Sequence, residues 1–349
     1  MNYDGIELDV INLGNADSIL ATQWTSGVPC RVLVDGGNPG DDAKVLSFLR
    51  VRGIKYLDHI VCSHPHEDHA GGLIGIVKSP AIDFGQAWIH LPWKHIDQNA
   101  LSNTLIRSEA SAKRAVKIIR DSLQIGQDLV AALTARKKPI QEPFARAHIG
   151  FLFVCGPSQQ FYEGLLRDFA DFEKLKGIEE SINAYELQGI VESLFEGTIL
   201  GRVDSQEATS GLGQAPTEPE NNSSTILWAE YSGQTLLLTA DAGVEALTAA
   251  KQDFKLSNVT WMQIPHHGSR RNVTEELINY FKPKLAWVSA DGTKKHPRRA
   301  VVNAFKATGA KVFSTHYPPP DGGHKWFHLG TVPNRPNYTD AVALYDADT

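Results

Sequence analysis

His64-Pro65-His66-Glu67-Asp68-His69 places four metal-binding side chains within six residues, in the pattern H-x-H-x-D-H. The segment follows an apolar run, 56–62, that predicts a buried strand, and it precedes small residues that can open a helix. Side chains on one strand-to-helix loop can converge on a small volume. Because one divalent ion takes about three or four ligands, this segment nearly fills one metal site or supplies two ligands to each of two adjacent ions.

The composition is that of a globular protein. Hydrophobic residues make up 42% of the 349 residues and charged residues 21%, enough apolar surface for a core. The sequence has no run of about eighteen apolar residues and no secretory leader at its start. Its three cysteines, Cys30, Cys62 and Cys155, are too far apart in sequence to indicate a disulfide framework. We therefore expect a cytoplasmic protein that does not bind membranes.

Charge is distributed unevenly along the chain. The formal net charge is −6, which by itself argues against a nucleic-acid partner. Residues 265–316, however, contain ten basic and three acidic residues. Solvated helix faces would give the same count, but a basic rim that attracts a phosphate-bearing substrate is the functional interpretation.

Each half of the chain begins with a hairpin and continues with alternating helices and strands of parallel type. This pattern predicts two β-sheets packed face to face with helices outside, an αββα sandwich of the α/β class. We expect a single domain over 1–349 with a helical insertion at about 95–200. A loop at about 201–222 is too poor in large apolar residues to order itself. Residues 149–154 are predicted to form one buried strand.

Three further segments offer metal ligands at predicted strand ends. Asp241 ends an apolar run, where it could bridge two ions or act as a helix N-cap. His266 and His267 follow another strand, and because adjacent side chains point in different directions, one is expected to ligate and the other to contact substrate or support a ligand. His90 ends the strand after the first ligand helix, which would bring it near the site if that strand is parallel to 56–62.

The motif His64-x-His66-x-Asp68-His69 resembles the signature of the metallo-β-lactamase-fold hydrolases. The chain is most similar to the hydrolase domain of ComEC-like competence proteins. This similarity extends over segments of both halves in the family's order: 8–10, 17–20, 33–37, 222–224, 239–241, 266–269 and 296–297. The sequence departs from the family in lacking a membrane channel, in having 12–17 where Gly-Gln-Gly-Asp is usual, and in carrying the helical insertion. The resemblance implies an αββα fold, a binuclear metal site and phosphodiester hydrolysis.

The resemblance also implies roles for the candidate residues. One ion would be held by His64 and His66, either with His90 as a third ligand or with fewer protein ligands. The other would be held by Asp68, His69 and His267, with Asp241 as the bridge. Asp35 is expected to support a ligand. The candidate catalytic residues are Asp68, His266 and His296, of which the two histidines could contact the phosphate or protonate the leaving oxygen. The expected phosphate contacts are Ser269, Lys295, Arg298 and Arg299.

We therefore predict a metal-dependent hydrolase, a phosphodiesterase or nuclease, in which two divalent ions lower the pKa of a shared water. Zinc is expected ahead of manganese, although nitrogen and oxygen ligands accept both. DNA or a nucleotide is the candidate substrate, and the inserted helices could form a lid, an oligomer surface or a docking element for a protein partner. One alternative is a hydrolase of small esters, lactones or phosphocholine-like molecules. Another is a regulatory module with a structural metal, which a ligand set with open positions argues against.

Overall fold

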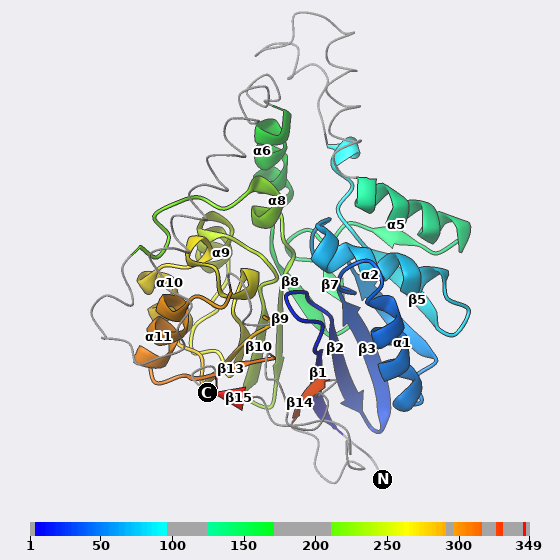
Figure 1. The fold of residues 1–349 in the computed structure, drawn as a ribbon, viewed down its shortest axis with the longest axis horizontal. Coiled ribbons are helices and arrows are strands. Elements are labelled where there is room, and N and C mark those ends of the chain that lie inside the picture. Colours follow the sequence, from blue (N-terminus) through cyan, green and yellow to red (C-terminus); the bar gives the residue numbers. More distant parts are fainter. Residues whose placement is uncertain are drawn as a thin grey trace, which may run out of the picture.

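The computed structural model describes residues 4–95, 124–170, 211–290, 296–315, 326–330 and 345–346. In these residues the chain forms two mixed sheets (Figure 1). The first sheet has the order β14 (Trp326–Gly330), β1 (Gly5–Ile11), β2 (Ile19–Thr25), β3 (Val28–Val34), β4 (Tyr56–Val61), β5 (Asp83–Trp88) and β6 (Ile140–Gln141). The second has the order β15 (Tyr345–Asp346), β13 (Lys311–Ser314), β12 (Leu285–Val288), β11 (Trp261–Gln263), β10 (Gln234–Leu238), β9 (Ile226–Tyr231), β8 (Leu152–Gly156) and β7 (His148–Ile149).

Both sheets change from antiparallel to parallel pairing along their length. In the first sheet β1, β2 and β3 pair antiparallel, and β3 through β6 pair parallel. In the second, β8, β9 and β10 pair antiparallel, and β10 through β13 pair parallel. Because parallel strands end at the same edge of a sheet, the loops after β3, β4 and β5 share one edge of the first sheet, and those after β10, β11 and β12 share one edge of the second. The two edges lie together, since His69 from the first sheet meets Asp241 and His267 from the second.

Three apolar clusters define four layers. One lies between the sheets and includes Leu8, Val32, Leu236 and Trp287. A second lies under the helices that cover the first sheet: α1 (Asp42–Val51), α2 (Glu67–Lys78) and α5 (Gln124–Ala135). The third lies under those that cover the second sheet: α9 (Val244–Asp253), α10 (Glu275–Phe281) and α11 (Arg299–Ala307). Figure 1 shows the two groups of helices on opposite sides of the sheets, so the αββα sandwich is confirmed.

The helices follow their sequence signals. Helix α1 buries Val45, Phe48 and Leu49, whose spacing of three and four residues places them on one face. Thr274 caps α10, because its hydroxyl accepts a hydrogen bond from the amide of Leu277 at 3.2 Å. Amphipathic spacing and capping therefore explain why these segments form helices that pack on a sheet.

Several boundaries differ from the sequence expectations. The expected strand over 149–154 is a hairpin, β7 and β8, because Gly150 adopts a φ of +60° and reverses the chain. Helix α2 begins at Glu67, so Asp68 and His69 belong to its first turn. The end of the expected loop 201–222 forms a short helix, α8 (Pro219–Asn222). Strand β14, which pairs with β1, was not expected.

The helical insertion lies only partly within the described residues. Its described parts include α5 and α6 (Gln159–Ala170), with the short 3₁₀ helix η1 (Pro92–Lys94) at its start. Residues 96–123 and 171–210 lie outside the described part, and the single-domain organisation stays a prediction. None of the helices in the described part combines the length and apolar composition that a membrane span requires.

Candidate metal centre

The H-x-H-x-D-H segment turns from β4 into α2, with His66 as the N-cap residue in an extended conformation. The first turn of α2 lies against the loop after β3, where a Cβ on Gly72 would be 1.8 Å from the carbonyl oxygen of Gly36. Only glycine permits this approach of two backbones. The close packing brings Asp35 within 2.8 Å of His69 Nδ1.

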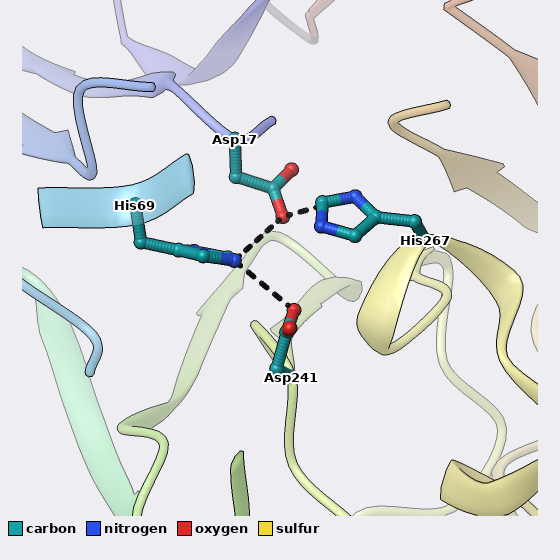
Figure 2. Close-up of side chains that lie close together, drawn as sticks. All are labelled: Asp17, His69, Asp241 and His267. Atoms are coloured by element: carbon teal, nitrogen blue, oxygen red, sulfur yellow. Dashed lines mark ion pairs between the residues drawn. The ribbon is translucent and has the colours of Figure 1, made fainter. Parts of the chain in front are cut away.

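Four side chains from distant parts of the chain converge at the edge of the two sheets (Figure 2). Asp17 lies in the loop between β1 and β2, His69 in the first turn of α2, Asp241 after β10 and His267 after β11. One potential ligand atom of each lies within 4.8 Å of those of the other three, and all four residues are buried. We call this group the buried cluster. It contains Asp17, which the sequence analysis did not single out as a ligand.

Asp68 lies beside the buried cluster. Its Oδ2 atom is 3.2 Å from His267 Nε2, and its Oδ1 atom is 3.9 Å from His69 Nε2. His69 Nε2 also lies 3.2 Å from Asp241 Oδ1 and 3.9 Å from Asp17 Oδ2. The structure therefore brings together the residues expected at the second ion, and it adds a third carboxylate to them.

Hydrogen bonds on the far side of each imidazole orient the rings. His69 Nδ1 faces Asp35, whose other oxygen accepts from the backbone amide of Ser63 at 2.8 Å. His267 Nδ1 lies 2.6 Å from the carbonyl oxygen of Ser289. Carbonyl and carboxylate oxygens accept, so each Nδ1 donates and each Nε2 faces the cluster. Whether Asp35 supports a ligand or is purely structural stays a prediction.

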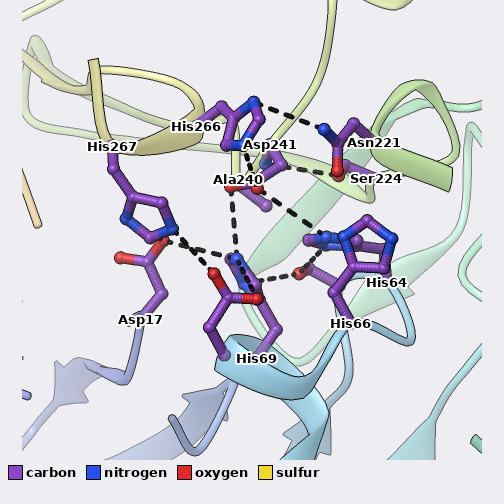
Figure 3. Close-up of polar contacts among 12 residues, drawn as sticks. Asp17, His64, His66, His69, Asn221, Ser224, Ala240, Asp241, His266 and His267 are labelled. Atoms are coloured by element: carbon purple, nitrogen blue, oxygen red, sulfur yellow. Dashed lines mark hydrogen bonds and ion pairs between the residues drawn. The ribbon is translucent and has the colours of Figure 1, made fainter. Parts of the chain in front are cut away.

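On the other side of Asp241 lies a more open group (Figure 3). Asp241 Oδ2 is 3.8 Å from His64 Nε2 and 3.6 Å from His266 Nε2. The rings of His64 and His66 are neighbours, with centroids 4.7 Å apart. His64 is fully buried, whereas His66 is 29% exposed. We call His64, His66 and the facing oxygen of Asp241 the open side.

His266 and His267 both face the site. Their φ values are 48° and 52°, a left-handed conformation that is uncommon outside glycine. Because of this turn the two rings face different carboxylates: His266 Nε2 faces Asp241 Oδ2, and His267 Nε2 faces Asp68 Oδ2. His267 thus belongs to the buried cluster, and its role as the ligand of the pair stays a prediction.

The structure places His90 among aromatic side chains. Its ring stacks on Tyr162 with centroids 4.5 Å apart and lies 4.8 Å from Phe144. Its Nε2 atom is 3.4 Å from the hydroxyl of Thr225. Burial, aided by the charge of His95, lowers the pKa of His90 to about 3. His90 belongs to neither group of potential ligands found in the described residues, and its role as a ligand stays a prediction.

Charges within the site shift its titrations strongly. Burial disfavours the charged form of His267, but Asp241, a hydrogen bond to Asp68, and Asp17 together raise its pKa to about 9. The same balance of burial against Asp241 and Asp68 raises the pKa of His69 well above its usual value. Burial raises the pKa of Asp17, against the opposing effects of His267 and His69. These imidazoles therefore hold the protons that a bound cation would displace.

The donor set fits a divalent ion. The Nε2 atoms of His64 and His69, the Oδ1 atom of Asp241 and both oxygens of Asp17 are buried without a hydrogen bond. Two ligands of one tetrahedral zinc, each about 2.0–2.1 Å from the metal, lie about 3.3 Å apart. The separations of 3.2 to 3.9 Å around His69 are close to that spacing. Buried carboxylates and imidazoles without other partners are what a metal centre requires.

A pocket of about 180 Å³ opens onto these residues. It is lined by His66, Asp68, Glu218, Asn221, Asp241, His266, Ser269, Arg270, Arg271, His296 and Arg298. Of the residues expected to contact phosphate, Ser269 and Arg298 line the pocket and Arg299 does not. Lys295 lies outside the described residues. Arg270 and Arg271, which the sequence analysis counted only as part of a basic region, are placed directly at the pocket.

Comparisons with known proteins identify a matching family. Residues 30–123 match the model of the metallo-beta-lactamase superfamily. ComE operon protein 3 of Bacillus subtilis (strain 168) is 27% identical over 140 residues, which is 39% of this chain. The match spans only 18% of that relative's length.

Solved structures with related folds share little sequence with this chain. The metallo-beta-lactamase fold protein YhfI of Bacillus subtilis is 10% identical, with 94% of this chain and 100% of that chain covered and a TM-score of 0.45. The hydrolase AbOPH of the beta lactamase superfamily is 11% identical, with 94% and 92% covered and a TM-score of 0.34. A putative metallo-beta-lactamase of Thermotoga maritima is 12% identical, with 43% and 65% covered and a TM-score of 0.26.

The segment that matches the family model contains the whole His64–His69 motif. The motif's side chains meet Asp241 and His267 from the second half of the chain at the edge of two stacked sheets. On these grounds residues 30–123, with the ligand motif that they carry, are similar to the metallo-beta-lactamase superfamily.

Proposed function

We propose that this protein is a metal-dependent hydrolase that cleaves phosphodiesters, acting as a nuclease or a nucleotide phosphodiesterase. The observation that supports the substrate class is the pocket over the metal ligands. Asp68, Asp241 and His66 form part of its wall, and Arg270, Arg271 and Arg298 form another part. Guanidinium groups recognise phosphate oxygens in a fixed planar geometry. A phosphate in this pocket would lie between those cations and the metal ligands.

Divalent ions, when bound, would supply a water of lowered pKa and positive charge for the developing oxyanion. The chain's residues would hold those ions and keep the pocket polar. His64, His69, Asp241 and His267 are buried to 4% exposure or less, so their positions are fixed by packing. Asp68 is 30% exposed and lines the pocket, and this supports a role in both binding an ion and contacting the reacting groups.

His266 is better suited to accept than to donate a proton. Asn272 donates to the carbonyl oxygen of Asp241 at 2.8 Å, so its side-chain oxygen is the acceptor for His266 Nδ1 at 3.0 Å. The contact with Asn272 is shorter than the one between the same Nδ1 atom and Asn221 Nδ2 at 3.3 Å, so we assign the proton to Nδ1 and the lone pair to Nε2, toward Asp241. Burial lowers the pKa of His266 despite the opposing charge of Asp241. We assign proton donation to the leaving oxygen to His296, whose ring lies 5.6 Å from that of His266 at the pocket wall.

The test is hydrolysis of bis-p-nitrophenyl phosphate and of labelled single- and double-stranded DNA, with zinc and with manganese. The variants are His64→Ala and Asp241→Ala, with Glu67→Gln as the control, because Glu67 is an exposed carboxylate next to Asp68. Metal-dependent cleavage by the wild type and by Glu67→Gln, and by neither alanine variant, is the expected result.

The substrates separate the remaining possibilities. Cleavage of DNA identifies a nuclease. Cleavage of the small diester alone keeps the phosphodiesterase and directs the search to nucleotides and phospholipid headgroups. If no diester is cleaved while the protein binds metal, the phosphate assignment is wrong, and esters and lactones become the substrates to test.

A further inference from the structure

On the open side of Asp241, the sequence led us to expect His90 as the partner of His64 and His66. His64 and His66 are present, but the histidine proposed as their partner, His90, lies in the aromatic group with Tyr162. Instead, two carboxylates from the segment before β9 approach His66. Ligand atoms of His66, Glu218 and Glu220 lie within 4.8 Å of one another, and Glu218 Oε2 is 3.9 Å from His66 Nε2.

His64 gives independent evidence that a ligand belongs on this side. Its side chain has no exposed surface, yet its Nε2 atom makes no hydrogen bond. That atom lies 3.8 Å from Asp241 Oδ2, and the ring is adjacent to that of His66 (Figure 3). A buried imidazole nitrogen is normally paired, and a cation held by His64, His66 and Asp241 would pair it.

The two carboxylates are held by local structure. Pro219 begins α8, and the amide of Asn222 donates to the carbonyl oxygen of Glu218 at 3.1 Å. The hydroxyl of Ser223 donates to the carbonyl oxygen of Glu220 at 2.6 Å. These bonds fix the backbone that carries both side chains, so the approach to His66 does not depend on a free loop.

The charge of Glu218 also indicates a cation on the open side. Glu218 lines the pocket that also contains Arg271 and Arg298. A carboxylate at the wall of a phosphate-binding pocket would repel the substrate, since like charges in a partly buried site are unfavourable. A divalent ion between Glu218 and His66 removes that conflict and turns the carboxylate into part of the site.

We propose that Glu218 and Glu220, together with His66, supply ligands to the ion on the open side, in the place expected for His90. This inference rests on the proposed metal site but not on the identity of the substrate. Mixed carboxylate and imidazole ligation suits manganese as well as zinc. The centre is open to the pocket, because Glu218 is 65% exposed and His66 is 29% exposed.

The test measures bound metal directly. Metal-free wild type, Glu218→Gln/Glu220→Gln and Glu67→Gln are titrated with zinc and with manganese, and binding is followed by calorimetry and by metal analysis after dialysis. The wild type and Glu67→Gln should bind two ions, one more weakly than the other. In the double variant the weaker dissociation constant should rise at least about tenfold, since even partners of ligands contribute about 10–100-fold. The tighter ion should be unchanged.

Each outcome decides the matter. Two ions with unchanged constants in the double variant would overturn the proposal, as would a wild type that binds a single ion removed by Asp68→Ala. A wild type that binds no ion would refute the metal site as a whole, which is a different failure. Thermal unfolding of the metal-free proteins serves as a folding control. If the double variant unfolds at a lower temperature than the wild type, the single variants Glu218→Gln and Glu220→Gln are titrated in its place, with the same criteria.

Discussion

The two sides of Asp241 are built in different ways. On one side, Asp17, His69 and His267 are each 3% exposed or less and come from three separate parts of the chain. On the other, His64 and His66 come from one loop, and the neighbouring Glu218 is 65% exposed. Charged side chains that are buried together destabilise the fold unless an opposite charge compensates them. An ion bound by exposed side chains, in contrast, exchanges freely with the solvent. We therefore expect a tight ion in the buried cluster and a weaker, exchangeable ion on the open side.

Asp241→Asn should have the largest effect, because Asp241 faces both sides. Asparagine keeps the shape and removes the negative charge that is shared between His64, His69 and His266. Metal content should fall at both centres, and hydrolysis should fall by more than about 100-fold, beyond the loss caused by removing partners of ligands. A variant that lost only the weaker ion would show that Asp241 does not bridge the two sides.

His267→Ala and His266→Ala should separate the sides. His267 lies 3.2 Å from Asp68 in the buried cluster, so its removal should abolish tight metal binding. His266 Nε2 lies 3.6 Å from Asp241 Oδ2, on the side away from the buried cluster, and His266 lines the pocket. Its removal should keep the tight ion and lower the rate of hydrolysis. Metal analysis and initial rates of the two variants, compared in parallel, would contradict the assignment if the effects were reversed.

Asp17→Asn should change stability in opposite directions with and without metal. Burial raises the pKa of Asp17, so its ionised form at neutral pH opposes folding of the metal-free protein. The variant should be more stable than the wild type by about 1 kcal/mol in the absence of metal, comparable to relieving an unsatisfied buried group. With metal, the wild type should be the more stable protein. Denaturant unfolding with and without a chelator measures both.

The control for this experiment is Asp9→Asn. Asp9 is also 1% exposed, but it lies in β1 with Arg52 as a partner at 3.9 Å. Its replacement should destabilise the protein to the same extent with and without metal. If Asp17→Asn behaved in the same way as Asp9→Asn, then Asp17 would not take part in metal binding.

The stability of the metal-free protein should depend on pH through the buried cluster. The pKa of His267 is about 9 in the folded protein and about 6.5 in an unfolded chain. Because the folded value is the higher one, its stabilising contribution is complete below pH 6.5 and is lost as the pH rises through 9. Metal-free protein should therefore lose stability over this interval. Metal binding should strengthen over the same interval, because fewer protons compete with the ion for the imidazole nitrogens. Unfolding curves at three pH values, recorded with and without metal, would check both statements.

Arg271→Gln and Arg299→Gln should give the smallest effects and should differ. Arg271 lines the pocket, so its loss should raise the KM for a charged diester a few-fold and weaken its dependence on salt, with little change in kcat. Arg299 does not line the pocket, and its variant should keep the wild-type KM. Equal effects of the two would indicate a general attraction by the basic region rather than contact within the pocket.

Much of the site could be predicted because its signals are local. His64, His66, Asp68 and His69 lie within one turn and one loop, so their proximity follows from chain geometry alone. Asp241 was found because an apolar strand ends in a carboxylate. Asp17 was not, although it lies in a short loop of the first hairpin. The backbone amide of Asp17 donates to the carbonyl oxygen of Asp68 at 3.1 Å, and this contact joins segments that no local pattern connects.

The sequence by itself determined the sandwich class, the ligand loop and the strand-end positions of Asp241 and His267, because hydrophobic periodicity and turn residues act over short distances. The tertiary structure decided which groups meet: it added Asp17 to the cluster, put His90 against Tyr162, and turned both His266 and His267 toward the site. These outcomes depend on contacts between residues far apart in sequence and on two consecutive left-handed backbone conformations. Neither feature produces a hydrophobic periodicity that could be recognised in the sequence.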